Sequence, residues 1–215
     1  MTFFKYISFI IILLSSSYGQ SFGKNKVQYR DFEWSYIQTP NFDIYFYGEN
    51  QDLAEFTSKV SEEAYEQIST HLAWDLKNRV SILVYNSHNE FQQTNVVGVY
   101  MSEGIGGVTE LFKNRVVFPF DGDFEQFRHV IHHELVHAML NDMVYGGTAQ
   151  NMVASRTRVR IPLWSNEGLA EFLSSNWDTK ADMVLRDIAI HERIPSVTEL
   201  NYFMAYKGGQ SLWSC

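Results

Sequence analysis

The spacing of apolar residues predicts that the first half of the chain mixes strands with helices. In residues 32–47 apolar and polar positions alternate around the break Thr39-Pro40-Asn41, which predicts a two-stranded hairpin. In residues 52–76 apolar positions recur every three or four residues, as in a helix that packs against a sheet. The run Val80–Tyr85 is rich in β-branched residues and predicts a buried strand, and Asn86-Ser87 predicts the cap of a short helix.

A second hairpin is predicted within residues 108–120. Two strand-like runs there flank Lys113-Asn114, which are typical turn residues. If this hairpin forms a sheet edge beside a cleft, its free backbone groups could pair with an extended peptide. The glycines within residues 104–107 lack the strand and helix context of a phosphate loop, so nucleotide binding is not expected.

The remaining pattern is that of helices separated by glycine and proline. Asp123 is a candidate N-cap for a long helix that ends at Tyr145-Gly146-Gly147. Pro162 fits the first turn of a second helix, and residues 179–191 have the spacing of a third. Gly208-Gly209 is expected to form a turn near the end of the chain.

Together these elements predict an α+β fold with two lobes. Residues 20–120 would form an N-terminal α/β lobe with a small mixed sheet, and residues 121–215 a mainly helical lobe. Residues 1–19 combine Lys5, an apolar stretch and a small-residue cleavage site, which predicts a signal peptide. The apolar stretch is shorter than the roughly 20 residues that span a bilayer, so stable membrane insertion of the mature chain is not expected.

The charge balance changes which partners are expected. The chain has 17 Lys and Arg residues against 25 Asp and Glu residues, for a net charge of −8. Nucleic acids and anionic membranes are bound by clustered positive charge, so neither is an expected partner. The signal peptide predicts export to the periplasm, the cell surface or the medium. The single cysteine, Cys215, cannot form a disulfide within this chain.

The most specific chemistry lies in His133-Glu134-Leu135-Val136-His137. Residues four apart on a helix project from the same face, so the two histidines can share one metal ion. Glu134 is turned about 100° round the helix from His133, to the rim of the metal site, where it can accept a proton from water. The spacing also arises by chance on ordinary helices, so a third ligand has to support it.

Two glutamates one turn apart follow on the next predicted helix. Glu167 lies far enough after His137 for a loop and an antiparallel helix to bring its carboxylate to the same ion. Glu171 would lie behind it and accept the free imidazole N–H of a ligating histidine. His129, one turn before His133, is a weaker candidate, because a helix does not bring three successive turns onto one ion. Two imidazoles, a carboxylate and an open position suit Zn²⁺ that activates water.

The motifs His-Glu-x-x-His and Trp-x-x-Glu-Gly-x-Ala-Glu resemble those of the gluzincin metallopeptidases. Residues 27–207, with "YNSHNEFQQTN", "GGVTELFKNRVVFPF" and "RHVIHHELVHAML", are similar to peptidase-MA-like domains of exported Bacteroidota proteins. Such a domain often precedes a TolB/WD40-like β-propeller, so a C-terminal propeller partner and a C-terminal truncation of this chain are expected. The resemblance implies a zincin-like fold and the following roles: zinc ligands His133, His137 and Glu167, general base Glu134, and Glu171 as the support of a ligand.

The resemblance also implies an exported zinc metallopeptidase that hydrolyses a peptide or protein substrate. Many zincins steady the oxyanion with a tyrosine or histidine, and Tyr206 is a candidate for that group, although a packed core tyrosine is the simpler interpretation. Two alternatives stay open: a catalytically inactive zincin-like module that docks partners at the envelope, and another metallohydrolase such as a deacylase. The complete set of ligands and base favours an enzyme over the docking module.

Overall fold

The structure is a computed structural model of the 215-residue chain. It describes residues 30–94, 104–110, 114–146, 161–191, 195–200 and 203–214. The predicted signal peptide, residues 1–19, lies outside these ranges and stays a prediction. Internal contacts divide the chain between Arg30 and Asp31, and all the elements below belong to the part that begins at Asp31. Within the described residues, no helix combines the length and the apolar character needed to cross a membrane.

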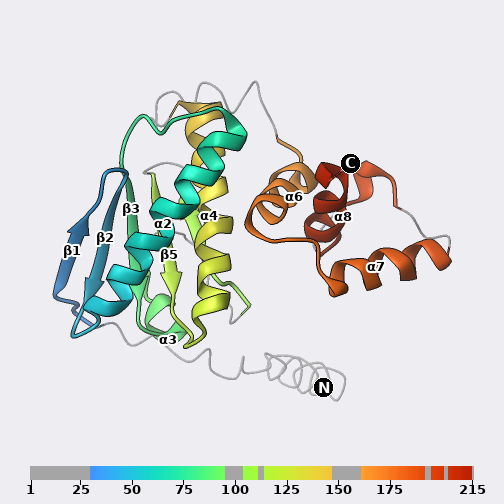
Figure 1. Cartoon of the computed structure of the whole chain (residues 1–215). Helices are drawn as coiled ribbons and strands as arrows, with labels where there is room; N and C mark the ends of the chain where they lie inside the picture. Colours follow the sequence, from blue (N-terminus) through green and yellow to red (C-terminus); the bar gives the residue numbers. More distant parts are fainter. Residues whose placement is uncertain are drawn as a thin grey trace, which may run out of the picture. The chain divides into compact units, whose positions relative to one another are not determined.

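One mixed five-stranded sheet occupies the first part of the described chain (Figure 1). Its order is β1-β2-β3-β5-β4, with antiparallel pairs at the two edges and parallel pairs in the middle. The strands are β1 (Trp34–Gln38), β2 (Phe42–Tyr47), β3 (Val80–Tyr85), β4 (Val108–Glu110) and β5 (Arg115–Pro119). Both predicted hairpins and the predicted strand between them are confirmed, and β4 is an edge strand.

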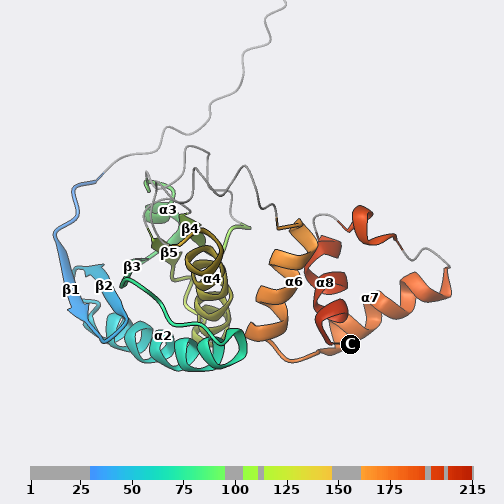
Figure 2. The same ribbon diagram turned by 90° about the horizontal axis from the view of Figure 1, so that it is seen from above.

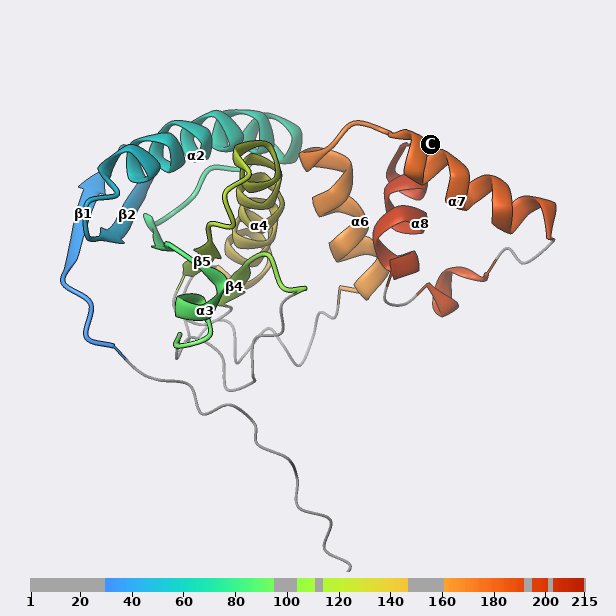
Figure 3. The ribbon, with the colours of Figure 1, turned by 90° about the horizontal axis from the view of Figure 1, so that it is seen from below.

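Two long helices, α2 (Gln51–Leu72) and α4 (Phe124–Tyr145), pack on one face of the sheet (Figures 1 and 3). Strand side chains alternate between the two faces, and the side chains beneath the helices are fully buried, as for Ile82 and Val116. Leu135 of α4 is in the same core. Burial of this apolar surface holds α4, the helix with the His-Glu-x-x-His motif, firmly against the sheet.

The end of α2 was predicted too late, because the helix stops at Leu72 instead of Leu76. Ala73 adopts a left-handed backbone with a φ of 49°, which closes the helix with a C-cap. The chain after the cap then reaches α4, where the indole N–H of Trp74 donates to the carboxylate of Asp142 at 3.0 Å. Since Asp142 is only 1% exposed, this contact secures the far end of α4.

The opposite face of the sheet carries a second, aromatic core beside the short helix α3 (His88–Phe91), on the far side from α2 in Figure 2. Ser87 caps α3 by accepting the backbone N–H of Glu90 at 3.3 Å, as predicted. The buried members of this core are Tyr47, Tyr85, Phe91 and Val117. Apolar side chains therefore pack against both faces of the sheet.

The described residues after 160 are helical: α6 (Leu163–Ser174), α7 (Thr179–Ile190), a 3-10 turn (Val197–Glu199) and α8 (Phe203–Ser214). Helix α6 begins directly after Pro162, and α7 covers the helix predicted in residues 179–191. Helix α6 packs against both α4 and α8. A sheet-bearing first part followed by helices confirms the predicted α+β class with a mixed sheet.

The predicted Gly208-Gly209 turn is wrong, because both glycines lie inside α8. A Cβ atom on Gly209 would overlap the carbonyl oxygen of Trp164, and a Cβ atom on Gly168 would overlap the backbone of Gly209. Helices α6 and α8 therefore cross with their backbones in contact, which glycine alone permits. These glycines serve helix packing, not chain reversal.

Candidate metal centre

Three side-chain atoms converge where α4 faces α6. Nε2 of His133 and Nε2 of His137 are 3.2 Å apart, and each lies 3.4 Å from Oε2 of Glu167. Neighbouring ligand atoms in a tetrahedral zinc site with bonds of about 2.0–2.1 Å are about 3.3 Å apart. These residues could therefore hold one small metal ion between them.

The local sequence explains why α4 presents both histidines. The Asp123 side chain caps the helix by accepting the N–H groups of Glu125 at 2.9 Å and Gln126 at 3.1 Å. Gly146 ends it with a left-handed φ of 73°. Both caps confirm the predicted helix ends, and the helix runs without a break through the motif. Residues 133 and 137 are therefore held one turn apart on one face.

The converging side chains are largely shielded from water. The side chains of His133 and His137 are each 11% exposed, and that of Glu167 is 14% exposed. Nδ1 of His137 is buried and has no hydrogen-bond partner among the described residues. Burying a carboxylate and two imidazoles is costly unless they are paired or bind a cation. The donor set of two nitrogens and one oxygen is one that zinc accepts.

Glu134 lies beside this group without joining it. Its Oε2 accepts a hydrogen bond of 2.6 Å from the hydroxyl of Thr109, which belongs to the edge strand β4. Glu134 lines the same cavity as His133 and Tyr206 but is not among the residues grouped around the candidate ion. This is the placement that the sequence predicts for a general base at the rim of the site.

Glu171 lies behind His133, on the side away from Glu167. Its Oε2 is 3.4 Å from Nδ1 of His133 and 3.7 Å from Nε2 of His129. Its Oε1 accepts a hydrogen bond of 2.7 Å from the ammonium of Lys207, which comes from α8. The carboxylate is therefore where the sequence predicts the partner of a ligating histidine, at ion-pair distance.

His129 is not one of the three converging residues. It forms a second His/Glu group with His133 and Glu171 that could in principle hold a cation. The ammonium of Lys207 already neutralises Glu171 there, at 2.7 Å, and repels a second cation. Of the two groups found among the described residues, that of His133, His137 and Glu167 has no cation already bound to it and lies beside Glu134, the candidate base.

Tyr206 from α8 covers the imidazole of His133. The two ring centroids are 5.8 Å apart and the ring planes are inclined by only 15°. The tyrosine side chain is 38% exposed, so it is not the packed core residue of the simpler interpretation. Burial raises the pKa of its hydroxyl, and the nearby Glu167 carboxylate raises this pKa further. The hydroxyl therefore keeps its proton at neutral pH and can donate it in a hydrogen bond.

The carboxylates and His133 shift one another's proton affinity. Burial lowers the pKa of His133, but Glu167 and Glu171 outweigh this effect and raise the pKa to about 9. Burial favours the neutral form of Glu167, yet hydrogen bonds from the two histidines hold its pKa well below the usual range. For Glu171, His133 and Lys207 likewise overcome burial and lower the pKa to about 2. Without metal, His133 thus carries a proton at neutral pH.

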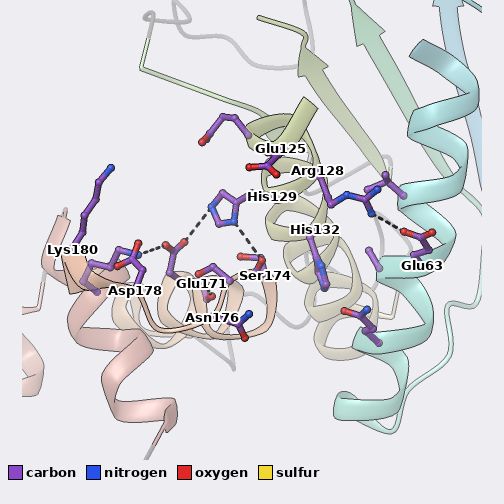
Figure 4. Close-up of a pocket in the computed structure, with 16 residues that line it drawn as sticks. Glu63, Glu125, Arg128, His129, His132, Glu171, Ser174, Asn176, Asp178 and Lys180 are labelled. Carbon is purple, nitrogen blue, oxygen red and sulfur yellow. Dashed lines mark hydrogen bonds and ion pairs between the residues drawn. The ribbon is translucent and has the colours of Figure 1, made fainter. Parts of the chain in front are cut away.

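Two cavities flank the site, with His129 and Glu171 lining both. The front cavity, of about 260 Å³, is lined by Glu134, His133, Tyr206 and glycines within residues 104–107. The back cavity, of about 750 Å³, lies between α2, α4 and α6, and there His129 points toward α6 and Arg128 toward α2 (Figure 4). The smaller front cavity is lined by Glu134 and by His133, one of the three candidate ligands, so it is the one suited to a reacting substrate.

Sequence reasoning missed the two supports that come from other elements, Thr109 and Lys207. Neither has a spacing relation to the motif, because β4 and α8 reach the site only through tertiary packing. For Gly107 the sequence did contain a signal, because this residue belongs to the cluster of glycines within residues 104–107. A Cβ atom there would lie 2.9 Å from Cγ of Glu134, so only glycine lets the chain pass this close to the base.

Comparison with known proteins adds no assignment to this geometry. No protein-family model matches the chain, and no curated protein matches it significantly. The functional argument therefore rests on the arrangement of the site and on the motifs that carry it.

Proposed function

We propose that this chain is an exported zinc-dependent peptidase with a zincin-like fold of the gluzincin type. The observation that carries the proposal is the convergence of His133 Nε2, His137 Nε2 and Glu167 Oε2, with separations of 3.2 to 3.4 Å. Glu134 lies beside these atoms and outside the set of ligands, as a base must. The resemblance of the motifs to gluzincins supports peptide bonds as the substrate over other acyl groups.

Each ligand residue has a defined role in holding the metal. His133 and His137 would bind the metal through Nε2 and Glu167 through Oε2, the atoms that converge in the structure. Zinc bound there would polarise the substrate carbonyl and lower the pKa of water toward neutrality. The Glu171 carboxylate, 3.4 Å from Nδ1 of His133, would accept the proton of that nitrogen in the metal-bound state, which would fix the imidazole tautomer and leave Nε2 free to bind.

The proton transfers fall to Glu134. Its carboxylate accepts a proton from the attacking water and later donates it to the departing amine. The hydroxyl of Tyr206, protonated at neutral pH and facing the same cavity, donates a hydrogen bond to the developing oxyanion. The reaction would therefore use one base and one neutral donor, which line the same cavity as His133.

An extended peptide is the substrate form that suits the cavity. In the described part of the chain β4 is the edge of the sheet, and its Thr109 contacts the base. Free backbone groups on an edge strand can pair with an incoming strand, which would bring a scissile carbonyl beside Glu134. The predicted signal peptide supports an extracytoplasmic substrate, and the family resemblance supports a C-terminal β-propeller as partner.

Hydrolysis by a zinc-loaded Glu134→Gln variant tests the proposal. Wild-type protein and variant are loaded with zinc, checked for equal metal content and assayed with a mixture of fluorogenic peptides. We expect equal zinc and a loss of turnover of about 10²- to 10⁴-fold in the variant, because glutamine cannot accept the proton. Glu125→Gln, an exposed change on the same helix, is the matched control and should keep wild-type turnover.

Two results would count against the peptidase. Undiminished hydrolysis by zinc-loaded Glu134→Gln would remove Glu134 from the mechanism. A zinc-loaded wild type that hydrolyses none of the peptides would instead favour the docking module.

A further inference from the structure

The side chain of Thr109 faces the metal centre because of its position in the sheet. Thr109 pairs directly with Val116, and paired residues of neighbouring strands point to the same face. Val116 is fully buried in the core beneath α2 and α4. The hydroxyl of Thr109 is therefore directed at α4, where it meets Glu134.

The opposite face of the same strand pair holds β4 in register. Glu110 pairs with Arg115, and their side chains form an ion pair of 2.6 Å, with exposed fractions of 11% and 25%. A slip by one residue would turn Thr109 away from the helix and break this ion pair. The position of the hydroxyl is thus fixed by the strand, and the β-branched side chain has little rotational freedom.

The hydroxyl has one proton and two acceptors within reach. Oγ1 of Thr109 lies 2.6 Å from Oε2 of Glu134 and 3.0 Å from its backbone oxygen. A hydroxyl bound to a carboxylate has a separation of about 2.5–2.7 Å, so the proton goes to Oε2. Among the described residues, no hydrogen bond reaches the other carboxylate oxygen of Glu134.

The rest of the Glu134 side chain is confined as well. Gly107 passes so close that a Cβ atom would lie 2.9 Å from Cγ of Glu134 and 3.0 Å from the ring of Phe118. The Glu134 side chain is therefore confined at two points: by the backbone of Gly107 at Cγ and by the Thr109 hydroxyl at Oε2. Thr109 engages one oxygen of this carboxylate, and Glu134 itself lines the front cavity.

We infer that Thr109 is the positioning residue of the general base, a role that rests on the proposed peptidase function. Its hydroxyl engages Oε2 of Glu134 so that Oε1 receives the proton of the attacking water. Thr109 also belongs to the strand proposed to pair with the peptide. The same strand thus orients both the substrate and the base that acts on it.

Thr109→Val tests this role, because valine keeps the shape and loses the hydroxyl. In zinc-loaded protein we expect unchanged metal content, a kcat reduced about 10- to 100-fold and a KM within about 2-fold of wild type. Thr109→Ser restores the donor and should recover kcat to within about 3-fold. Thr57→Val is the matched control, since the Thr57 hydroxyl is buried and donates to the Leu53 carbonyl at 2.7 Å, within α2 and away from Glu134. Its kcat should be that of wild type.

Thermal unfolding supplies a readout that does not depend on activity. Thr109→Val should lower the unfolding midpoint of the metal-free protein by about 4–8 °C in the wild-type background. In a Glu134→Ala background the same change should lower the midpoint by less than half as much, because the partner is already gone. Equal shifts in both backgrounds would overturn the inferred contact.

The kinetic outcomes separate this inference from the proposed function. An active wild type whose kcat is unchanged by Thr109→Val would overturn the positioning role alone. A zinc-loaded wild type without hydrolytic activity would overturn the peptidase, and the positioning role with it.

Discussion

His133 contacts side chains from three helices, α4, α6 and α8. Its Nε2 faces His137 and Glu167, its Nδ1 faces Glu171, and its ring lies under Tyr206. The two carboxylates raise its pKa to about 9 in the absence of metal, despite the opposing effect of burial. At neutral pH this histidine therefore holds a proton that the proposed zinc ion would have to displace, since zinc binds the neutral imidazole.

Zinc binding should release close to one proton per ion at pH 7. Because the pKa of metal-free His133 is raised to about 9, the proton is bound throughout pH 6–8 and zinc affinity should rise about tenfold per pH unit over that window. Isothermal titration calorimetry in two buffers of different ionisation enthalpy at each pH measures the number of protons released.

The matched control for proton release is His132→Gln. Burial lowers the pKa of His132 to about 4, so this neighbour is already neutral and its loss should leave the proton count unchanged. Zinc affinity that is flat between pH 6 and 8, with no proton released, would contradict the assigned protonation of His133.

At the residue scale, local spacing predicted one part of the site and not the other. His133, Glu134 and His137 lie on one helix, so helical geometry alone places them, and the structure shows them where spacing puts them. Glu167 was predicted as the third ligand from its motif and from its distance after His137 along the chain. The contacts of Thr109 and Lys207 with the site could not be predicted, because the spacing of residues along the chain does not show how β4 and α8 pack in the fold.

At the scale of elements, the crossing of α6 and α8 sets the geometry around the candidate metal centre. Gly168 lies next to Glu167 in α6, and its Cα atom touches the backbone of Gly209 in α8. Helix α8 then carries Tyr206 to the front of His133 and Lys207 to Glu171 behind it. The two glycines therefore act on the site through helix packing.

Gly168→Ala should separate these helices and loosen the site. The added methyl overlaps the backbone of Gly209, so the helices must shift, at a cost of about 1–3 kcal/mol. We expect the unfolding midpoint to fall by about 2–12 °C and zinc binding to weaken, as Tyr206 and Lys207 move away. Differential scanning calorimetry and competition with a chelator measure the two effects.

Gly104→Ala is the control for this packing prediction, because a Cβ atom at Gly104 would meet nothing within 4 Å. Its midpoint should stay within about 2 °C of wild type. A Gly168→Ala variant as stable as wild type would show that the close crossing of α6 and α8 is not required.

The periodicity of apolar residues predicted most helices and strands, but the predicted end of α2 and the predicted turn at Gly208-Gly209 were wrong. The period of two in residues 32–47 and the helical period after residue 51 were enough to place β1, β2 and α2. The end of α2 was missed because Ala73, which gives no sequence signal for a left-handed cap, adopts one. Gly208-Gly209 was assigned to a turn because the same residue type serves both chain reversal and close helix contact.

At the scale of the whole described fold, the site joins elements that are distant in sequence. The sheet and α2 support α4, which carries two candidate ligands and the candidate base. Helix α6 carries the third candidate ligand, and α8 packs against α6. The α+β class followed from the order of strands and helices alone. The packing of α6 against α4 and α8 could not be predicted in this way, because it depends on contacts between separate elements.

The zinc content of the purified chain tests the central claim most directly. Mass spectrometry under native conditions, on the wild type and on Glu167→Ala purified without added metal, counts zinc per chain. Near one zinc in the wild type and near none in the variant is the predicted result, because Glu167 supplies one of the three converging ligand atoms. A folded wild type without zinc, or a Glu167→Ala variant that retains it fully, would contradict the three-ligand metal centre.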